Sequence, residues 1–208
     1  MKLVVGLGNP GRRYAATRHN VGFRIVECFA EQRGIDLATP KFDGRFGRGK
    51  IRLPGGEALD VGVLEPQTYM NTSGGSVCEA LRFLPIEDPK RDLLVVFDDV
   101  DLPFGRLRIR PRGGAAGHKG LAHVIERLGH SDFARLRFGV GRPISAMDTA
   151  DYVLQRFGAD EERVLADRLV DAAEALGTIL VEGLSVAMNR YNRDPVASNG
   201  LEGSDALD

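Results

Sequence analysis

The feature that most constrains the fold is a near-continuous apolar run over residues 92–97, which leads directly into the acidic stretch Asp-Asp-Val-Asp at 98–101. Apolar residues at successive positions are typical of a strand that is covered on both faces, as at the centre of a parallel sheet. Residues that follow such a strand lie at its carboxyl end, where open α/β sheets place their functional sites. The run therefore predicts a buried central strand and the edge of the sheet that carries the chemistry.

Strand-like and helix-like segments alternate along the chain. A Pro-Gly-Gly turn at 54–56 separates two segments with the pattern of a hairpin. The alternation predicts the α/β class with a mixed sheet between helices, and no repeat or linker divides the chain. Residues 1–193 are therefore expected to form one domain, and the polar, acidic stretch 194–208 is expected to be a disordered tail. We expect strands over 2–7, 46–53, 59–64, 92–97, 106–110 and 135–140, and helices over 21–33, 75–84, 118–128, 160–181 and 184–191.

Composition is that of a soluble globular protein. Of the 208 residues, 43% are hydrophobic and 27% are charged, and no apolar run approaches the length of a membrane span. The amino terminus lacks the basic and apolar regions of a secretory signal. Cys28 and Cys78 fall in apolar helical patterns and are expected to be free thiols, which suits a reducing cytoplasm.

Charge is nearly balanced overall but unevenly distributed. The formal net charge is -1, yet Arg106, Arg108, Arg110 and Arg112 alternate with other residues over 106–112. This period of two predicts guanidinium groups on one face of a strand. A local basic stripe indicates a small anionic footprint rather than long coverage of a nucleic-acid duplex. Arg110 and Arg137 together could hold a phosphate, although a solvated strand face explains either arginine equally well.

A histidine in a polar context is the strongest candidate for catalysis. His19 lies in the segment Thr-Arg-His-Asn at 17–20 and follows the glycine-rich turn 6–11. Histidine is the commonest general base, and a carboxylate that accepts a hydrogen bond from one ring nitrogen fixes its tautomer. Asp98, at the end of the apolar strand, is the natural partner. A capping or packing role is the alternative for His19, but its polar surroundings favour catalysis.

Two amides and a second histidine extend this candidate site. Asn9 and Asn71 lie in loops, and each amide can donate and accept hydrogen bonds, which suits an oxyanion, a water or a peptide backbone. Ordinary turn chemistry is the alternative for both. His118, which follows the glycine loop 113–117, is a weaker candidate. No serine or cysteine has the Gly-x-Ser-x-Gly spacing of a nucleophile elbow, so direct attack by an activated water is favoured over covalent catalysis.

Three other ligand classes fit the sequence poorly. The glycines at 6, 8 and 11 match the dinucleotide fingerprint formally, but no helix follows directly and the expected acid on a second strand is absent. The loop at 114–120 lacks the Gly-Lys-Ser/Thr of a P-loop. The acids at 98–101 offer too few ligands for a carboxylate metal site, and no Cys/His pair has zinc spacing.

Taken together, these residues resemble the bacterial-type peptidyl-tRNA hydrolase family. Several separate motifs agree with that family in order and spacing over residues 1–193, which is far more specific than any one motif. The matching segments are 6–11 (Gly-Leu-Gly-Asn-Pro-Gly), 17–20 (Thr-Arg-His-Asn), 66–74 (Pro-Gln-Thr-Tyr-Met-Asn-Thr-Ser-Gly), 98–103 (Asp-Asp-Val-Asp-Leu-Pro), the glycine loop with His118, and 135–143.

The resemblance implies a fold, a reaction and roles for individual residues. The fold is a single-domain, three-layer α/β/α sandwich around a mixed, mostly parallel twisted sheet, monomeric and without metal or cofactor. Its reaction is hydrolysis of the ester between a peptide and the 3′-terminal ribose of peptidyl-tRNA, at the acceptor end and 3′-CCA, which recycles tRNA dropped from the ribosome in the cytoplasm. By similarity, His19 is the base and Asp98 orients it. The resemblance further assigns Asn9, Tyr14, Met70, Asn71 and Lys119 to the substrate, and Arg110 and Arg137 to tRNA phosphate.

Lys119 is the main departure from the family pattern. The family commonly has Gly-His-Asn-Gly where this chain has Gly-His-Lys-Gly at 117–120. Lys119 can replace an amide contact by a charge contact to ribose or phosphate. The alternative function is that of a non-catalytic, RNA-binding member of the same fold. The intact set of His19, Asp98, Asn9 and Asn71 argues against that alternative.

Overall fold

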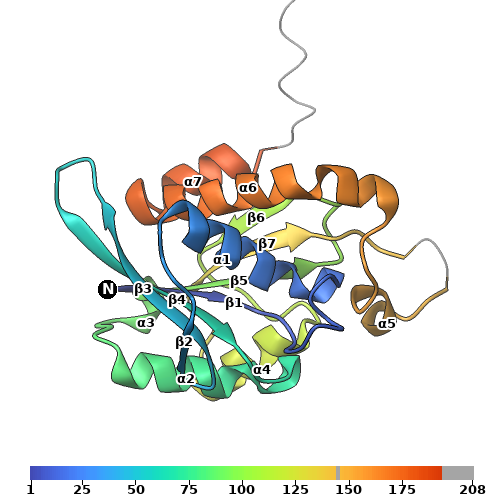
Figure 1. Cartoon of the computed structure of the whole chain (residues 1–208), viewed down its shortest axis with the longest axis horizontal. Coiled ribbons are helices and arrows are strands. Elements are labelled where there is room, and N and C mark those ends of the chain that lie inside the picture. Colours follow the sequence, from blue (N-terminus) through green and yellow to red (C-terminus); the bar gives the residue numbers. More distant parts are fainter. Residues whose placement is uncertain (144–145, 194–208) are drawn as a thin grey trace, which may run out of the picture.

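The strands form one mixed sheet between two layers of helices (Figure 1). The structure is a computed structural model and describes residues 1–143 and 146–193. The expected disordered tail at 194–208 therefore lies outside the described residues. In the described chain the strands are β1 (Lys2–Gly6), β2 (Thr39–Lys41), β3 (Gly44–Arg52), β4 (Ala58–Pro66), β5 (Leu93–Asp99), β6 (Leu107–Arg110) and β7 (Ala134–Gly139).

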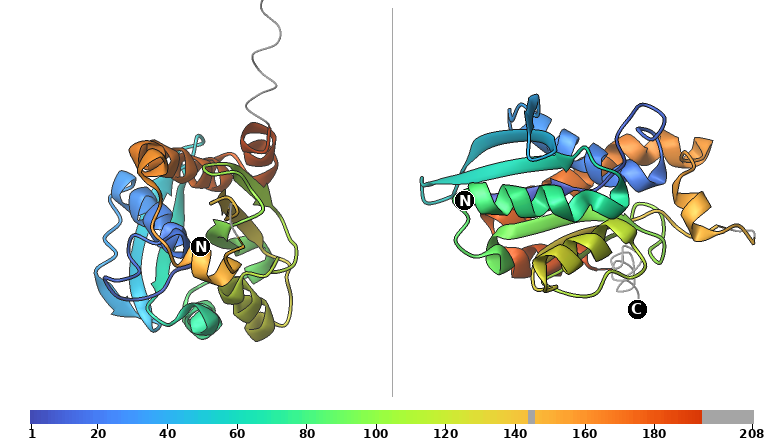
Figure 2. Two further views of the ribbon diagram at one scale, coloured as in Figure 1. Left: turned by 90° about the vertical axis from the view of Figure 1, so that its right-hand side faces the viewer. Right: turned by 90° about the horizontal axis from the view of Figure 1, so that it is seen from below.

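Helices cover both faces of this sheet (Figures 1 and 2). The α-helices are α1 (Val21–Gln32), α2 (Ser73–Phe83), α3 (Pro89–Asp92), α4 (Lys119–Leu128), α5 (Thr149–Val153), α6 (Ala159–Val181) and α7 (Leu184–Tyr191), and the short 3-10 helices are η1 (Arg18–Asn20) and η2 (Met70–Thr72). Helices α1, α6 and α7 lie on one face and α2 and α4 on the other, which is the expected three-layer arrangement. Within the described residues, none of the helices combines the length and apolar character needed to span a bilayer.

Parallel pairing occupies the middle of the sheet. The strand order is β2-β3-β4-β1-β5-β7-β6, in which β4, β1, β5 and β7 pair in parallel. Strands β3 and β6 run antiparallel to their neighbours, so five of the seven described strands point in one direction. All seven residues of β5 are buried, which confirms the interior strand predicted from the apolar run.

Local sequence patterns located most of these elements. Strands β3 and β4 form the predicted hairpin, in which Arg52 pairs with Ala58 around the Pro-Gly-Gly turn. Three short elements, β2, α3 and α5, were not predicted from the sequence, and each has five residues or fewer. Segments this short contain too few residues to establish a period of 2 or 3.6.

Alternation along the strands builds two hydrophobic cores, one on each face of the sheet. In β1, Val4 belongs to the core beneath α1 and α6, whereas Leu3 and Val5 belong to the core beneath α2 and α4. All three side chains are fully buried, and burial of each contributes roughly 1.5–3 kcal/mol. Packing on both faces fixes the carboxyl ends of β1 and β5, where the candidate residues lie.

The glycine-rich turn after β1 makes a close contact with the start of α1. A Cβ on Gly6 would lie 2.5 Å from the carbonyl oxygen of Gly22. A Cβ on Gly22 would lie 2.4 Å and 2.6 Å from the carbonyl oxygens of Leu7 and Val96, and a Cβ on Gly8 would meet an aromatic ring of α1 at 2.7 Å. The missing side chains let α1 begin directly against β1 and β5. Close packing thus accounts for these glycines without a dinucleotide.

Candidate active site

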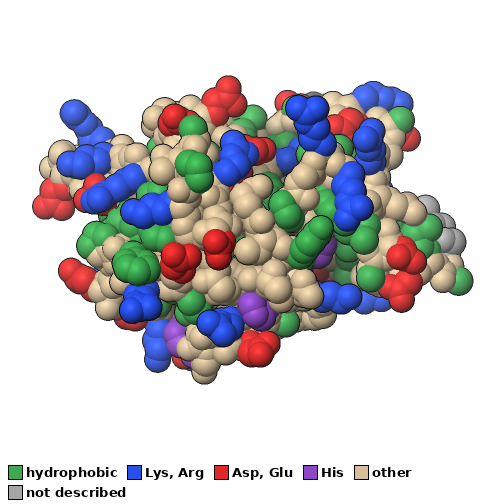
Figure 3. Space-filling view, turned by 60° about the horizontal axis from the view of Figure 1, so that its bottom comes forward, with side chains coloured by type: hydrophobic (Ala, Val, Ile, Leu, Met, Phe, Trp, Pro, Cys, Tyr) green, Lys and Arg blue, Asp and Glu red, His purple; other side chains and the backbone are tan. Residues whose placement is uncertain are grey.

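A cavity of about 700 Å³ opens at the carboxyl ends of β1 and β5, the edge of the sheet that the sequence indicated. Figure 3 shows a hollow on the right-hand side of the molecule, with hydrophobic side chains around it and histidine atoms inside it. Loops from both halves of the chain meet at the cavity. The predicted residues that line it are Asn9, His19, Met70, Asn71, Asp98, His118 and Lys119.

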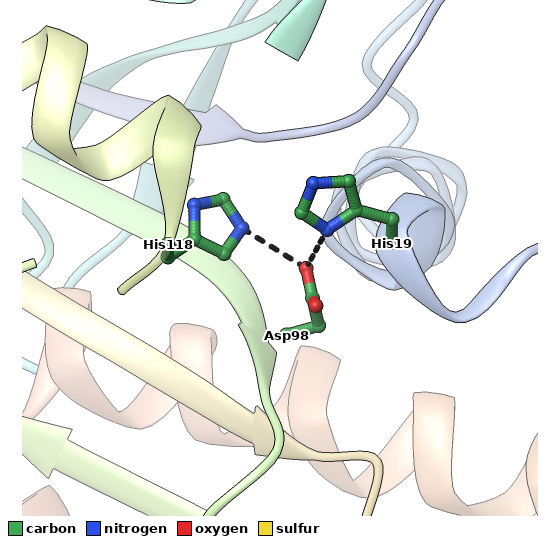
Figure 4. A group of neighbouring side chains, drawn as sticks. All are labelled: His19, Asp98 and His118. Atoms are coloured by element: carbon green, nitrogen blue, oxygen red, sulfur yellow. Dashed lines mark hydrogen bonds and ion pairs between the residues drawn. The ribbon is translucent and has the colours of Figure 1, made fainter. Parts of the chain in front are cut away.

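His19 and Asp98 form the pair that the sequence predicted. Nδ1 of His19 lies 2.8 Å from Oδ1 of Asp98, and both residues are buried. His19 belongs to η1, directly before α1, so the glycine contact with β5 brings the two residues together. The second ring nitrogen, Nε2, points away from Asp98 (Figure 4), and within the described chain it makes no hydrogen bond. His19 is therefore placed to take a proton from a water in the cavity.

Asp98 is held in its ionised form. Burial alone would raise the pKa of this carboxyl, but electrostatic attraction by His19 and His118 and hydrogen bonds from both rings lower the pKa of Asp98 well below its ordinary value. An ionised carboxylate only accepts hydrogen bonds. Nδ1 of His19 must then carry the ring proton, which leaves the lone pair on Nε2 for general-base catalysis.

His118 binds the same carboxylate oxygen. Its Nε2 lies 3.0 Å from Oδ1 of Asp98, and its Nδ1 accepts a hydrogen bond from the backbone N–H of Leu121 at 3.1 Å. Figure 4 shows the rings of His19 and His118 on either side of this oxygen. His118 was only a weaker candidate from the sequence, because nothing local indicates that the loop before α4 returns to the end of β5.

The two histidines and Asp98 also have the spacing of a metal site, with ligand atoms within 4.8 Å of one another. Their hydrogen bonds argue for another use. A neutral histidine that binds a metal through one nitrogen carries a proton on the other and donates it to an acceptor. Nδ1 of His118 instead accepts from the N–H of Leu121, which has no lone pair to receive a proton. The arrangement suits proton placement better than metal binding.

Asn9 is fixed with its amide nitrogen available to the cavity. Its Oδ1 accepts a hydrogen bond from the backbone N–H of Met70 at 2.8 Å. The side chain of Asn20 makes two hydrogen bonds with the backbone of Asn9. Its Oδ1 accepts from the N–H and its Nδ2 donates to the carbonyl oxygen, both at 2.9 Å. Because Oδ1 is occupied, Nδ2 is the end that can donate to a developing oxyanion. Asn20 had no predicted role of its own, since its partner Asn9 lies across a turn.

Arg18 ties the turn that carries His19 to the second half of the chain. The residue is buried, and its Nη2 lies 2.6 Å from Oε2 of Glu161. A second nitrogen donates to the carbonyl oxygen of Arg156, and the guanidinium carbon lies 4.3 Å from the ring centroid of Tyr152. Arg18 was expected only as part of the polar surroundings of His19, because these partners are more than a hundred residues away in the sequence.

Three other predicted residues line the cavity. Met70 is buried and packs against the start of α4, where a Cβ on Gly120 would lie 2.3 Å from the Met70 sulfur. Asn71 and Lys119 are exposed. Among the described residues neither side chain has a hydrogen-bond partner, so both can contact a ligand.

Tyr14 differs from its expected place, because it does not line the cavity. Its carbonyl oxygen accepts hydrogen bonds from the backbone and the hydroxyl of Thr17. Its own hydroxyl accepts from Arg13 at 2.5 Å, and the guanidinium of Arg13 lies 4.4 Å from the ring centroid. The local turn satisfies Tyr14, so nearness to His19 in sequence does not bring it to the site.

The predicted arginine face lies beside the cavity rather than inside it. Of the four arginines expected on one strand face, only Arg108 and Arg110 lie in β6, whose bounds leave out Arg106 and Arg112. Arg108 and Arg110 pair with Arg137 and Arg135 of β7, respectively, so these four strand residues lie on one face of the sheet. Arg110 is exposed, whereas Arg135 is buried and donates to carbonyl oxygens of the glycine loop. The guanidinium of Arg137 pairs with the carboxylate of Asp99. Arg110 and Arg137 do not line the cavity, so any ligand they contact extends beyond it.

Comparison with known proteins identifies the family. The sequence model of a family described as peptidyl-tRNA hydrolase matches residues 3–199. The chain belongs to the peptidyl-tRNA hydrolase family. The peptidyl-tRNA hydrolase of Chloroflexus aurantiacus is 50% identical over 192 residues, which cover 92% of this chain and 99% of that protein. The peptidyl-tRNA hydrolase of Symbiobacterium thermophilum is 49% identical over 191 residues, covering 92% and 98%.

Solved structures of the peptidyl-tRNA hydrolase family share the fold. The crystal structure of peptidyl-tRNA hydrolase from Acinetobacter baumannii matches with a TM-score of 0.82 at 39% sequence identity, covering 92% of this chain and 94% of that one. Sequence and fold therefore agree, and the resemblance drawn from the motifs is confirmed. As a member of this family, the chain is a hydrolase, and its fold belongs to the α/β class.

Proposed function

We propose that this member of the peptidyl-tRNA hydrolase family cleaves the ester between a peptide and the 3′-terminal ribose of tRNA with a water activated by His19. The observation that carries the proposal is the buried His19–Asp98 pair, with 2.8 Å between Nδ1 and Oδ1, at the wall of the cavity. The described lining contains no serine or cysteine. Direct attack by water therefore fits this site better than an acyl-enzyme route.

In the first step, Nε2 of His19 takes a proton from water while the water oxygen attacks the ester carbonyl carbon. The new C–O bond displaces the carbonyl π electrons onto oxygen and creates a tetrahedral oxyanion. Asp98 stabilises the imidazolium through the hydrogen bond at Nδ1. A positioned general base of this kind accelerates a reaction by about 10²–10⁴-fold.

In the second step, the oxyanion collapses and the bond between the carbonyl carbon and the ribose oxygen breaks. His19 returns its proton to that oxygen, so the products are a free peptide and a tRNA with an intact 3′ hydroxyl. Nδ2 of Asn9 is the donor we assign to the oxyanion, since Met70 occupies the other end of the amide. One donor of this type stabilises a transition state by roughly 3 kcal/mol.

The substrate contacts follow from exposure and position. Asn71 and Met70 line the cavity beside Asn9 and suit the peptide end of the substrate. Lys119, exposed at the start of α4, suits the terminal ribose or phosphate. Arg110 and Arg137 lie beyond the cavity and suit phosphates farther from the 3′ end. A single-stranded CCA end can enter a cavity that a duplex cannot. Tyr14 has no part in this assignment.

We further infer a cytoplasmic enzyme that works as a monomer without metal or cofactor. Each group assigned above comes from one chain, so the proposed chemistry needs no second subunit. Cys28 and Cys78 are free thiols, which agrees with a reducing compartment.

The test is release of a labelled N-acyl-amino acid from N-acyl-aminoacyl-tRNA, measured with EDTA present for wild type and His19→Ala. We expect rapid release by wild type and a loss of about 10²–10⁴-fold in the variant. Far-UV circular dichroism checks that the variant is folded, and a His123→Ala variant serves as a matched histidine control outside the cavity lining. Near-wild-type turnover by folded His19→Ala would refute the role of His19. If wild type binds tRNA but releases nothing, the non-catalytic alternative is correct.

A further inference from the structure

We infer that His118 is a positioning residue whose hydrogen bonds fix the tautomer of the His19–Asp98 pair from the amino terminus of helix α4. The chain of contacts runs from a backbone amide through His118 and Asp98 to His19. At each link, the atom that donates the hydrogen bond determines which atom donates at the following link. The kinetic test of this inference rests on the proposed function, whereas the tautomer itself can be measured in the resting protein.

The first link is the cap of α4. His118 is the N-cap residue of this helix, and its Nδ1 accepts a hydrogen bond from the N–H of Leu121 at 3.1 Å. A backbone amide can only donate, so Nδ1 of His118 must present a lone pair. Neutral His118 therefore carries its ring proton on Nε2. The helix terminus, whose first N–H groups need acceptors, selects this tautomer.

The second link is the bond from His118 to Asp98. With the proton on Nε2, His118 donates to Oδ1 of Asp98 over 3.0 Å. Aromatic neighbours restrict the ring of His118, whose centroid lies 4.9 Å from that of Phe97 and 4.8 Å from that of His19. Both partners of the hydrogen bond are buried. The carboxylate is thereby held at one orientation by a donor that does not take part in proton transfer.

The third link is the base itself. Oδ1 of Asp98 receives two N–H donors, from His118 and from Nδ1 of His19. A carboxylate oriented by His118 keeps the proton of neutral His19 on Nδ1 and the lone pair of Nε2 toward the cavity. Without His118, Oδ1 of Asp98 would retain one of these two donors and would be held less firmly. Its negative charge, no longer shared between two imidazoles, would act on His19 alone.

Other charged groups at this cavity bear on the test. Asp99 and Asp101 are paired with Arg137 and Arg142, so their charges are largely compensated. Lys119 and Asp148 also line the cavity, and both are exposed. None of these groups contacts His118 through a hydrogen bond recorded among the described residues. Substitution of His118 therefore acts on His19 mainly through Asp98.

The experiment is the pH dependence of kcat/KM for N-acyl-aminoacyl-tRNA with His118→Asn. Asparagine is a strong N-cap residue and retains an acceptor for Leu121, but it is too short to reproduce both contacts of the imidazole. We expect a folded variant whose acid limb moves to higher pH by about 0.5–1 unit, because a carboxylate with one donor fewer stabilises the imidazolium of His19 more strongly. A structural defect alone would lower the rate equally at every pH.

The matched control is His123→Asn. His123 lies on the same helix, and its Nδ1 also accepts a backbone hydrogen bond, from Gly74 at 2.9 Å, but it does not touch Asp98. We expect no displacement of the acid limb in this variant. Equal displacement in both variants, no displacement in His118→Asn, or loss of all activity at every pH in folded His118→Asn would each overturn the positioning role.

Nuclear magnetic resonance tests the tautomer without substrate. Long-range ¹H–¹⁵N correlation on histidine-labelled protein distinguishes the two neutral tautomers of each ring. We expect the Nε2–H form for His118 and the Nδ1–H form for His19 in wild type. The His19 signals should lose their single-tautomer pattern in His118→Asn. An Nδ1–H form of His118 would refute the inference even if the enzyme hydrolyses peptidyl-tRNA as proposed.

Discussion

Replacing Glu65 by glutamine should flatten the pH dependence of stability. Glu65 lies on β4 and is 0% exposed, and its Oε2 is 2.9 Å from Nη1 of Arg45. The same nitrogen of Arg45 also pairs with Glu27 at 2.9 Å. Oε1 of Glu65 has no hydrogen-bond partner among the described residues. One half-exposed guanidinium therefore serves two carboxylates, one of which is completely buried.

The direction of the effect follows from the pKa. Burial is the main cause that raises the pKa of Glu65, repulsion from Glu27 adds to it and attraction by Arg45 opposes it, and together they raise this pKa from 4.5 to about 8. The folded protein thus holds this proton more tightly than the unfolded chain does. The stabilisation is complete below the unfolded pKa of 4.5 and is lost as pH rises through the folded pKa of about 8. The difference between these two pKa values corresponds to at most about 5 kcal/mol of unfolding free energy, and relaxation of the surroundings around the charge would reduce it to about half.

The assay is urea unfolding at several pH values between about 5 and 8, within the window set by the two pKa values. Far-UV circular dichroism is the probe, since the chain contains no tryptophan. Wild type should lose about 2–3.5 kcal/mol of unfolding free energy from this group between pH 5 and pH 8, whereas Glu65→Gln should not. Glu57→Gln, an exposed carboxylate in the same hairpin, is the control and should follow wild type. Parallel curves for wild type and Glu65→Gln would mean that Glu65 is ionised in the folded protein and would refute this reasoning.

Three further predictions concern the site and its supports. Asp98→Asn should lower kcat/KM by about 10²-fold, less than His19→Ala, because it disturbs the orientation of the base without removing it; a loss as large as that of His19→Ala would contradict this. Arg110→Gln should raise KM for the tRNA substrate with little change in kcat. It should also reduce the slope of log KM against log salt concentration by the amount that corresponds to about one phosphate contact; an unchanged slope would show that Arg110 does not contact phosphate. Arg18→Met should cost about 1–3 kcal/mol of stability, since it removes the charged hydrogen bonds of Arg18 to Glu161 and to the carbonyl oxygen of Arg156. Urea unfolding that matches wild type would show that this ion pair does not support the turn.

The long and periodic elements could be predicted from the sequence alone. The apolar run of β5, the amphipathic α1 and the β3–β4 hairpin all have patterns that local physics interprets directly. The expected pairing of His19 with Asp98 also followed from local reasoning, because one residue lies after a glycine turn and the other at the end of a buried strand. The positions of both residues follow from the rule that the loops after parallel strands meet at one edge of an α/β sheet.

The supports of the site could not be predicted in the same way. The start of the α4 helix at residue 118 was predicted locally, but the tautomer of His118 also depends on the return of its loop to Asp98 of β5, which no local pattern indicates. Arg18 contacts residues 138 and 143 positions away. Tyr14 differs from its prediction for the opposite reason, since its hydrogen bonds are made with Arg13 and Thr17 in its own turn and it does not line the cavity. In each case long-range geometry decides between roles that the residue type leaves open.

The absent side chain of Gly22 makes the spacing of the active site a property of the protein interior. One methyl group on its Cα would sit 2.4 Å from the carbonyl oxygen of Leu7, directly after β1, and 2.6 Å from that of Val96 in β5. His19 is three residues away on the same rigid turn, and Asp98 is two residues beyond the β5 contact. The distance between His19 and Asp98 therefore depends on how closely α1 packs against β1 and β5. Mutations that loosen this junction should reduce the rate while every catalytic side chain is still present.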